Sequence, residues 1–415
     1  MMNTSKHIKT GVITIVFVIA AGIAAPAATI TSDEGSLFNP NDGTSLGVLD
    51  LDSGSLTFDT DALTVSGAVE GDGEEAQSEN HGTGNGVEMA VFTFDSVDLS
   101  GVSINVTGKR GLVLASKSDM TIDSDVTFDD LNGSNGGNKY GNGSASGGPG
   151  GPGAEGGTRL NYGSEDPPSG NCGRGGNGYD VGNPRSGSGY GGGEMGADKS
   201  GGSGGGYGGA GGAGGGNQGQ VGQAYPSGDD TVTTLYGGSG GAGGRYRHPS
   251  GPYNAEGGGG GGGGALQLIA VKNLEFKGTI NVNGGKGGNA NASGSARDGG
   301  GGGGSGGGVI LAATTLDFSG VVNAEGGQGG DAMHSGYPDG GGGGGGRIAW
   351  YCNTLKLAGT AYESGDDLSG YYNVAGGSAG GGGASAGSDG TFWLSVDNGV
   401  GFPYAPPTGT LISIR

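Results

Sequence analysis

Tyrosine is the residue type best suited to bind a ligand in this sequence, because nine of its fifteen tyrosines gather between residues 133 and 264. A tyrosine ring offers a large contact area at low cost in side-chain entropy and carries a polar hydroxyl, as in binding loops. The same rings could instead pack over a glycine-rich surface as its core. The candidate ligand-binding residues are Tyr179, Tyr190, Tyr207, Tyr225, Tyr236 and Tyr246.

One stretch has the spacing of a calcium site. Residues 326–334 read GGQGGDAMH, which fits the nonapeptide G-G-x-G-x-D-x-U-x with Asp331 as the carboxylate ligand. Such sites need adjacent copies, and the related stretch carries Asn289 in place of the aspartate, 42 residues away. Asp331 is therefore a weak calcium candidate, and a solvated aspartate is the simpler interpretation. No other metal site and no cofactor is expected.

Catalytic motifs lack a supporting context in this sequence. The pattern G-x-S-x-G occurs around Ser203, Ser239 and Ser305, but each match lies inside a glycine tract, where it arises by chance. Every G-x-G-x-x-G has the same weakness, and Lys286 is followed by glycine rather than by the Ser or Thr of a phosphate-binding loop. We therefore expect a protein that is not an enzyme.

The chain has only two cysteines, Cys172 and Cys352. In an oxidising compartment they allow a single disulfide, and the alternative is two unpaired thiols. Because 180 residues separate them, both alternatives stay open.

Short strands recur along the chain and would position these residues. Their apolar residues stand at alternate positions around a glycine and include many β-branched and aromatic types, which is the pattern of a β-strand. No window shows the stripe of a helix. We therefore predict an all-β protein. The six segments are 63–69, 97–106, 120–126, 274–282, 316–322 and 355–361.

The spacing of these segments favours a parallel β-helix. Val97 and Met120 lie 23 residues apart, which fits one coil of about three five-residue strands with short turns. Leu274 and Leu316 lie 42 residues apart, and Leu316 and Leu355 lie 39 apart. We therefore expect these longer coils to carry additional Gly-rich loops. Stacked coils bury an apolar face that no single coil could bury. The alternative, an antiparallel sandwich, predicts Asn-Gly or Asp-Gly turns, which the paired runs lack.

Glycine accounts for 112 of the 415 residues and gathers in tracts such as 257–264 and 340–346. Stretches such as 205–216 keep a G-G-x beat, and a left-handed helix with three residues per turn puts every third residue on one edge. With glycine on the other edges, neighbouring tracts could exchange backbone hydrogen bonds as packed polyglycine II helices. The alternative is a flexible linker. We expect packing, because bonds worth about 1 kcal/mol each would offset the flexibility of glycine.

The N-terminus and the charge indicate export. Lys6 and Lys9 precede an apolar stretch at 11–25, and Ala25-Pro26-Ala27 is a small-residue cleavage signal. No second apolar span follows, so we expect no membrane span in the mature chain. The formal net charge of −21 argues against nucleic acid as a partner.

The stretches GGGGGGGGALQLIA…LEFKGTINVNGGKGG and GGGGSGGGVILAA…LDFSGVVNAEGGQGG resemble the glycine-rich β-helical surface proteins of bacteria, of the adhesin and autotransporter-passenger type. The tracts also resemble the polyglycine-helix bundles of phage tail-tip adhesins and of glycine-rich antifreeze proteins. The resemblance implies a secreted, extracellular or cell-surface protein. Its partner would be a surface glycan, a protein or a second copy of the chain.

Together these features predict four segments. They are a secretory signal peptide at 1–27, N-terminal β-helix coils at 28–132, a Gly/Tyr-rich insertion at 133–264, and C-terminal β-helix coils with Gly-rich loops at 265–415. The predicted function is that of an exported structural or adhesive protein of the cell surface or extracellular matrix, with binding carried by the insertion. Two further hypotheses are a β-helical polysaccharide-active enzyme and an ice-binding polyglycine protein.

Overall fold

The protein is all-β, as predicted. The computed structural model describes residues 29–32, 38–78, 88–140, 143–144, 150–152, 186–196, 199–217, 219–225, 235–245, 254–291, 297–332, 336–396 and 412–414. Every helix or strand assigned within these ranges is a β-strand. The predicted signal peptide at 1–27 lies outside the described residues.

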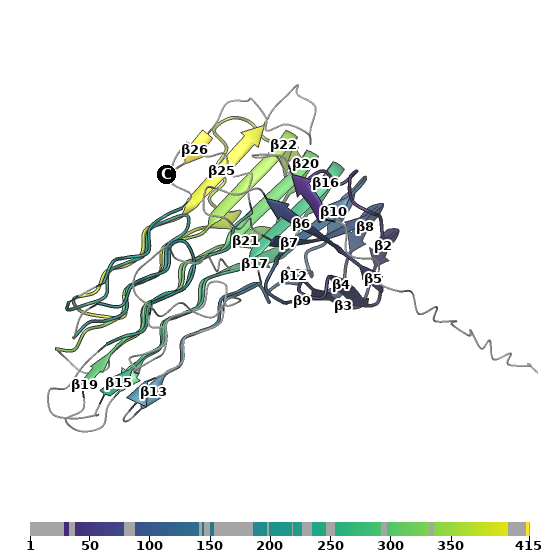
Figure 1. The fold of residues 1–415 in the computed structure, drawn as a ribbon. Helices are drawn as coiled ribbons and strands as arrows, with labels where there is room; N and C mark the ends of the chain where they lie inside the picture. The colour runs from purple at the N-terminus through teal and green to yellow at the C-terminus, as the bar shows by residue number, and fades with distance from the viewer. Residues whose placement is uncertain are drawn as a thin grey trace, which may run out of the picture.

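The strands form one large sheet and several smaller ones (Figure 1). The large sheet has 13 strands: β1 (Thr29–Ser32), β2 (Val48–Leu51), β6 (Glu74–Ser78), β7 (Glu88–Phe94), β8 (Ser96–Leu99), β10 (Gly111–Ser116), β11 (Met120–Ile122), β16 (Ala265–Phe276), β20 (Gly308–Phe318), β22 (Arg347–Leu357), β23 (Thr360–Ala361), β25 (Thr391–Val396) and β26 (Ile412–Ile414). A second sheet contains β12 (Thr127–Phe128), β17 (Thr279–Asn281), β21 (Val321–Asn323) and β24 (Tyr372–Asn373). A third contains β3 (Gly54–Asp59), β4 (Thr64–Gly67), β5 (Gly71–Asp72) and β9 (Val102–Thr107). The short strands β13 (Lys139–Tyr140), β14 (Gly143–Ser144), β15 (Asn254–Glu256), β18 (Ala290–Asn291) and β19 (Arg297–Gly299) form two small sheets.

Parallel pairing in the large sheet aligns the segments that recur in the sequence. Met120 pairs with Val97 on one side and with Leu274 on the other. Leu274 pairs with Leu316, and Leu316 with Leu355. Because one residue of slip would turn every side chain to the opposite face, this register stacks apolar positions on apolar positions.

The first recurring segment, 63–69, does not join this parallel stack. Its strand β4 pairs antiparallel with β3, and Phe58 is opposite Val65. The connection between Asp59 and Thr64 is too short for a crossover, and a parallel pair needs a crossover of a dozen or more residues. The segment is therefore half of a hairpin.

The main core lies between the sheets and is built from the inward positions of each strand. A row of aromatic rings runs through it: the ring centroids of Phe276 and Phe318 are 5.2 Å apart, those of Phe318 and Trp350 4.3 Å, and those of Trp350 and Phe392 5.0 Å. All four residues are buried. Strands β10, β16 and β20 are buried on both faces at their N-terminal halves, which explains their nearly continuous apolar sequences.

Beyond β12, β17, β21 and β24, the chain leaves the sheets along one glycine tract and comes back along another. The outgoing tracts are 131–138, 283–290, 324–332 and 374–380, and the return tracts are 257–264, 299–307, 339–346 and 385–390. The insertion adds further tracts, among them 200–206, 208–216 and 235–245. Figure 1 shows them as extended arms that lie side by side, with β13, β15 and β19 at their far end. We call this assembly the glycine bundle.

The return tract 299–307 exchanges backbone hydrogen bonds with six neighbouring tracts. Its N–H groups donate in three directions, each with a three-residue period: from Gly300, Gly303 and Gly306 to 338–344, from Gly301, Gly304 and Gly307 to 282–288, and from Gly302 and Ser305 to 239–242. Its carbonyl groups accept from 257–263, from 202–205 and from 327–330. The N–H···O distances are between 2.7 and 3.1 Å. The tract is therefore surrounded by hydrogen-bonded neighbours, with bonds that repeat every three residues.

The insertion is woven into this bundle. Gly302 donates to the carbonyl of Ala242, Gly202 donates to that of Gly300, and Gly260 donates to that of Gly302. Tracts from residues 133–264 thus lie on several sides of the tracts that follow them in sequence. The insertion and the C-terminal repeats share one hydrogen-bond network.

Close packing explains why the tract is glycine at every position except Ser305, whose Oγ accepts from Ser239 N at 2.8 Å. A Cβ atom at Gly303 would lie 2.0 Å from the carbonyl oxygen of Gly327, and one at Gly304 would lie 2.0 Å from that of Gly261. A Cβ at Gly302 would lie 2.2 Å from the oxygen of Ser203. Real Cβ atoms do not approach oxygen so closely. In the outgoing tracts one edge faces solvent, and the G-G-x beat places a side chain there.

We predict that Gly303→Ala destabilises the protein by about 1–3 kcal/mol, because its methyl group overpacks against the next outgoing tract. The matched control is Gln328→Ala, at an exposed x position of that tract, for which we expect a change of about 0.5 kcal/mol or less. Denaturant unfolding followed by circular dichroism measures both. Equal stability of the two variants would contradict the packing.

Candidate functional site

The outer face of the outgoing tracts is a regular array of side chains, all of them polar in the first three tracts. The x positions of its G-G-x beat carry Asn132, Asn135 and Asn138 in the first tract, Asn283, Lys286 and Asn289 in the second, Glu325, Gln328 and Asp331 in the third, and Ala375 and Ser378 in the fourth. A rise of about 3.1 Å per residue spaces them by roughly 9 Å along a tract. We call this surface the amide face.

The asparagine side chains of the amide face replace a missing tract. At the surface of the bundle one row of backbone N–H groups has no tract beside it, and the asparagine Oδ1 atoms accept these hydrogen bonds instead. Asn135 Oδ1 accepts from Lys286 N at 2.8 Å, and Asn138 Oδ1 accepts from Asn289 N at 2.7 Å. Asn283 Oδ1 accepts from Glu325 N at 2.8 Å.

The same bonds fix the orientation of the side-chain amides. The pattern continues at Asn289, whose Oδ1 accepts from Asp331 N at 2.9 Å. Within the described ranges, the Nδ2 groups of Asn135, Asn138, Asn283 and Asn289 have no partner. The face therefore presents oriented N–H donors without a further ordering cost.

An asparagine row extends the amide face onto the second sheet. Asn281 donates its Nδ2 hydrogen bond to Asp129, and Asn323 donates to Asn281 Oδ1 at 2.8 Å. Asn373 donates to Glu325. Residues 129, 281, 323 and 373 flank or end the strands that lead into the tracts, so the sheet and the tracts share one polar surface.

Four of the predicted tyrosines form a cluster where the insertion tracts meet the starts of β20 and β22. The ring centroids of Tyr207 and Tyr225 are 5.0 Å apart, and Tyr225 lies 6.2 Å from Tyr236 and 5.6 Å from Tyr190. The Tyr225 hydroxyl donates to the Gly237 carbonyl at 2.7 Å. These contacts make the cluster a small core of its own.

Burial separates the tyrosines that could contact a ligand from those that do not. Tyr207, Tyr225 and Tyr236 are buried, at 1%, 9% and 6% exposure, whereas Tyr190 is 40% exposed. Tyr179 and Tyr246 lie outside the described residues. The three buried rings serve packing. Of the described candidate tyrosines, Tyr190 is the one that a ligand could reach.

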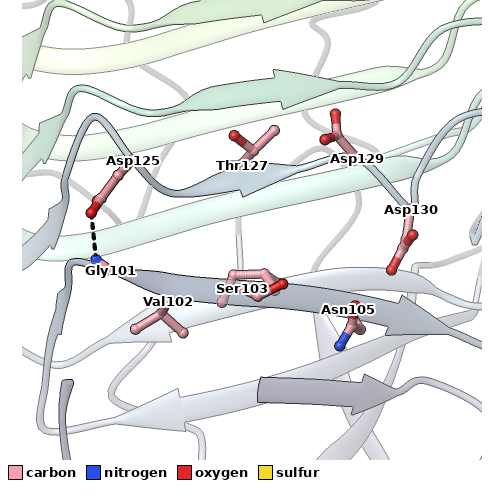
Figure 2. A pocket seen from close by; sticks show the side chains of 9 residues that line it. Gly101, Val102, Ser103, Asn105, Asp125, Thr127, Asp129 and Asp130 are labelled. Atoms are coloured by element: carbon pink, nitrogen blue, oxygen red, sulfur yellow. Dashed lines mark hydrogen bonds between the residues drawn. The ribbon is translucent and has the colours of Figure 1, made fainter. Parts of the chain in front are cut away.

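A groove of 570 Å³ lies between β9 and the segment around β12 (Figure 2). These strands belong to different sheets and do not pair with each other. Asp125, Asp129 and Asp130 line one side, and Ser103 and Asn105 line the other.

The aspartates of the groove hold the open edge of β9. Asp125 Oδ2 accepts from Gly101 N at 2.8 Å, and Asp130 Oδ2 accepts from Val106 N at 3.3 Å. Asp129 accepts the amide of Asn281. We interpret the groove as the seam at which two sheets separate, closed by carboxylates.

The calcium candidate, Asp331, has one carboxylate beside it. Burial raises the pKa of Asp339, and the charge of Asp331 raises it further, against the opposing hydrogen bond from Ala332 N at 2.8 Å. Two carboxylates do not complete a calcium site. Across the described part of the chain, no group of three or more His, Cys, Asp or Glu residues is arranged to hold a metal ion.

Carboxylates also stack on the solvent side of the large sheet. Asp50 pairs with Asp98, and Glu275 pairs with Asp317. Lys277 Nζ lies 2.9 Å from Glu275 Oε1. Burial, followed by the charges of Asp50, Asp123 and Glu275, raises the pKa of Asp98 above 3.8.

We predict that Asp98→Asn raises the melting temperature at pH 7. A carboxyl group whose folded pKa is raised favours the folded state at low pH, and this contribution is lost as pH rises through the folded pKa. The gain should be about 0.5 kcal/mol or less because the group is largely solvated, and it should vanish near pH 3. Thermal melts at both pH values measure it. Asp367→Asn is the control, since hydrogen bonds from Ser369 lower the pKa of Asp367, and it should give no gain.

Of the two cysteines, Cys352 is described, and it is a free thiol within the main core. Burial raises the pKa of its thiol to about 12. Cys172 lies outside the described residues, so their pairing stays a prediction. The position of Cys352 favours the unpaired alternative.

We predict that Cys352 resists alkylation in the native protein. Only the thiolate is nucleophilic, and burial both keeps the Cys352 thiol protonated and shields it from the reagent. In a Cys172→Ser variant, a maleimide reagent should react after addition of denaturant and not before, as followed by mass spectrometry. Rapid native labelling would contradict this placement. If the oxidised wild-type protein had a mass 2 Da below that of its reduced form, Cys172 and Cys352 would be paired in a disulfide.

The sequence analysis did not identify the amide face, although its signal is present. The x positions of NGSNGGN, NGGKGGN and EGGQGGD are polar in three successive outgoing tracts. Comparison of these stretches with one another would have revealed an aligned surface. Taken singly, two of these stretches show only the glycine spacing of a calcium-binding nonapeptide.

Comparison with known proteins gives no relative: no protein-family model, curated protein or solved structure matches the chain. Among the described residues, no helix has the length and apolar character to cross a membrane.

Proposed function

We propose that the chain is an exported, non-catalytic structural and adhesive protein of the cell surface or extracellular matrix. In this proposal a parallel β-helix carries a bundle of polyglycine II-type helices as a stiff arm. The six hydrogen-bonded neighbours of tract 299–307 support a rigid bundle rather than a tether. The path from large sheet to second sheet, and then out and back along two tracts, supports the β-helix.

The amide face is the adhesive surface in this proposal. The observation that carries it is the set of asparagines whose Oδ1 atoms are held by backbone N–H groups, so that their Nδ2 donors are already oriented. Preorganised groups lose little entropy on binding, and many weak contacts on one rigid surface act together. This differs from the tyrosine hypothesis, which now relies on Tyr190.

A neutral glycan is the partner that the chemistry favours. Sugar hydroxyl and ring oxygens accept hydrogen bonds from amide donors. The net charge of −21 disfavours sulfated or uronic-acid polymers through repulsion. A repeating polymer would offer acceptors to several rows of the face at once.

We predict that the double variant Asn135→Asp and Asn289→Asp lowers the amount of protein bound to insoluble cellulose or chitin at least threefold. The aspartate keeps the oxygen that accepts the backbone hydrogen bond, replaces the Nδ2 donor by a second oxygen, and adds one negative charge. Sedimentation of the polysaccharide with bound protein, at 0.15 M salt, measures the loss.

The matched control is Asn39→Asp with Asn353→Asp, which changes the net charge equally at a distance from the amide face. It should bind as the wild type does. Hydrogen exchange should show equal protection of 257–264 in all three proteins, which establishes that the bundle is intact. Equal binding by the two double variants, or wild-type binding to neither polymer, would overturn the glycan assignment. So would thermal hysteresis without polymer binding, which would assign the face to ice.

A further inference from the structure

Among the described residues, the last return tract, 385–390, has neighbours on half of its circumference. Gly342 and Gly345 of the preceding return tract donate to its Ser385 and Ser388 carbonyls at 3.0 and 2.9 Å. Gly387 donates to its own outgoing tract, at Gly377. The N–H groups of Ser385 and Ser388 bond to the insertion tract 208–216. In three of the six directions seen at 299–307, no described residue hydrogen-bonds to this tract.

One vacant direction is a row of backbone donors. In the preceding return tract, the equivalent N–H groups of Gly342 and Gly345 bond to 385–390. Those of Ala386 and Asp389 meet no acceptor in the part of the chain that the structure describes. An unpaired row of this kind is a template for a further chain, as at the edge of a sheet.

The side chains at this edge differ from those one repeat earlier. A Cβ atom at Gly342 would lie 1.9 Å from the carbonyl oxygen of Gly377, and one at Gly345 would lie 1.9 Å from that of Val374. Glycine is needed there because another outgoing tract follows. The equivalent positions after the last repeat are Ala386 and Asp389, both exposed.

Glycine persists in this tract only where its Cβ would point inward. A Cβ at Gly387 would lie 2.0 Å from the oxygen of Gly343, and one at Gly390 would lie 2.0 Å from that of Gly346. The sequence SAGSDG thus keeps glycine on the packed edge and places Ala386 and Asp389 on an edge without a described neighbour. Ser385 faces the insertion tract, where its Oγ accepts from Ala213 N at 2.7 Å.

We propose that Ala386 and Asp389 cap the glycine bundle against a second copy of the chain. Their Cβ atoms occupy the space that the next outgoing tract would fill, so an outgoing glycine tract of another molecule cannot pack beside the unpaired N–H row. The large sheet ends in a comparable way, because β26 pairs antiparallel with β25 and covers its outer edge. This inference is independent of the glycan proposal.

The test is the double variant Ala386→Gly with Asp389→Gly. We expect it to associate with increasing concentration, as measured by sedimentation velocity, while the wild type keeps one species over the same range. Hydrogen exchange of 257–264 monitors the fold. If the double variant failed to fold, Ala386→Gly alone would carry the test, since it retains the hydrogen bond from Gly376 N to Asp389 Oδ1 at 3.0 Å.

The matched control is Ala386→Ser with Asp389→Asn, which changes the polarity and charge but keeps both Cβ atoms. It should sediment as the wild type does. A folded glycine variant that sediments like the wild type would overturn the proposal. Association of the control variant would also overturn it, because charge rather than the Cβ atoms would then limit contact.

Discussion

The hydrogen bond between the backbones of neighbouring glycine tracts is the interaction on which this structure depends. At most inward positions it requires two chains to approach until a Cβ atom would overlap a carbonyl oxygen, so these positions are almost all glycine. At about 1 kcal/mol each, such bonds are individually weak. Around tract 299–307 they act in six directions, so the loss of one neighbour weakens several others. The sheets anchor one end of each outgoing and return tract and keep their registers aligned.

Part of the fold could be predicted from sequence because strand pairing obeys a local rule. Alternation around Leu274 and Leu316 revealed inward and outward positions, and their spacing matched the parallel register. The hairpin at 63–69 has the same alternation, so its sequence predicts the same pairing as that of the parallel segments. Pattern alone does not distinguish strand directions, whereas the length of the connection does.

The candidate site was harder to predict, because its geometry comes from neighbours distant in sequence. Asn135 meets Lys286 only when two outgoing tracts lie side by side, 151 residues apart. The same limit applies to the tyrosines, since the burial of Tyr207 depends on tracts that fold over it. For glycine, however, a local rule emerges. A tract with glycine at nearly every position, as at 299–307, is surrounded, one with G-G-x faces solvent on one side, and one with glycine at every third position lies at the end.

The near absence of side chains inside the glycine bundle has a thermal consequence. Burial of apolar surface gives folding its large heat-capacity change and weakens on cooling. The interior of the bundle is made of peptide groups, whose hydration changes the heat capacity in the opposite sense. The arm and the aromatic core around Phe318 should therefore respond differently to temperature. At low temperature the aromatic core loses part of its hydrophobic stabilisation, whereas the hydrogen bonds of the glycine bundle keep theirs.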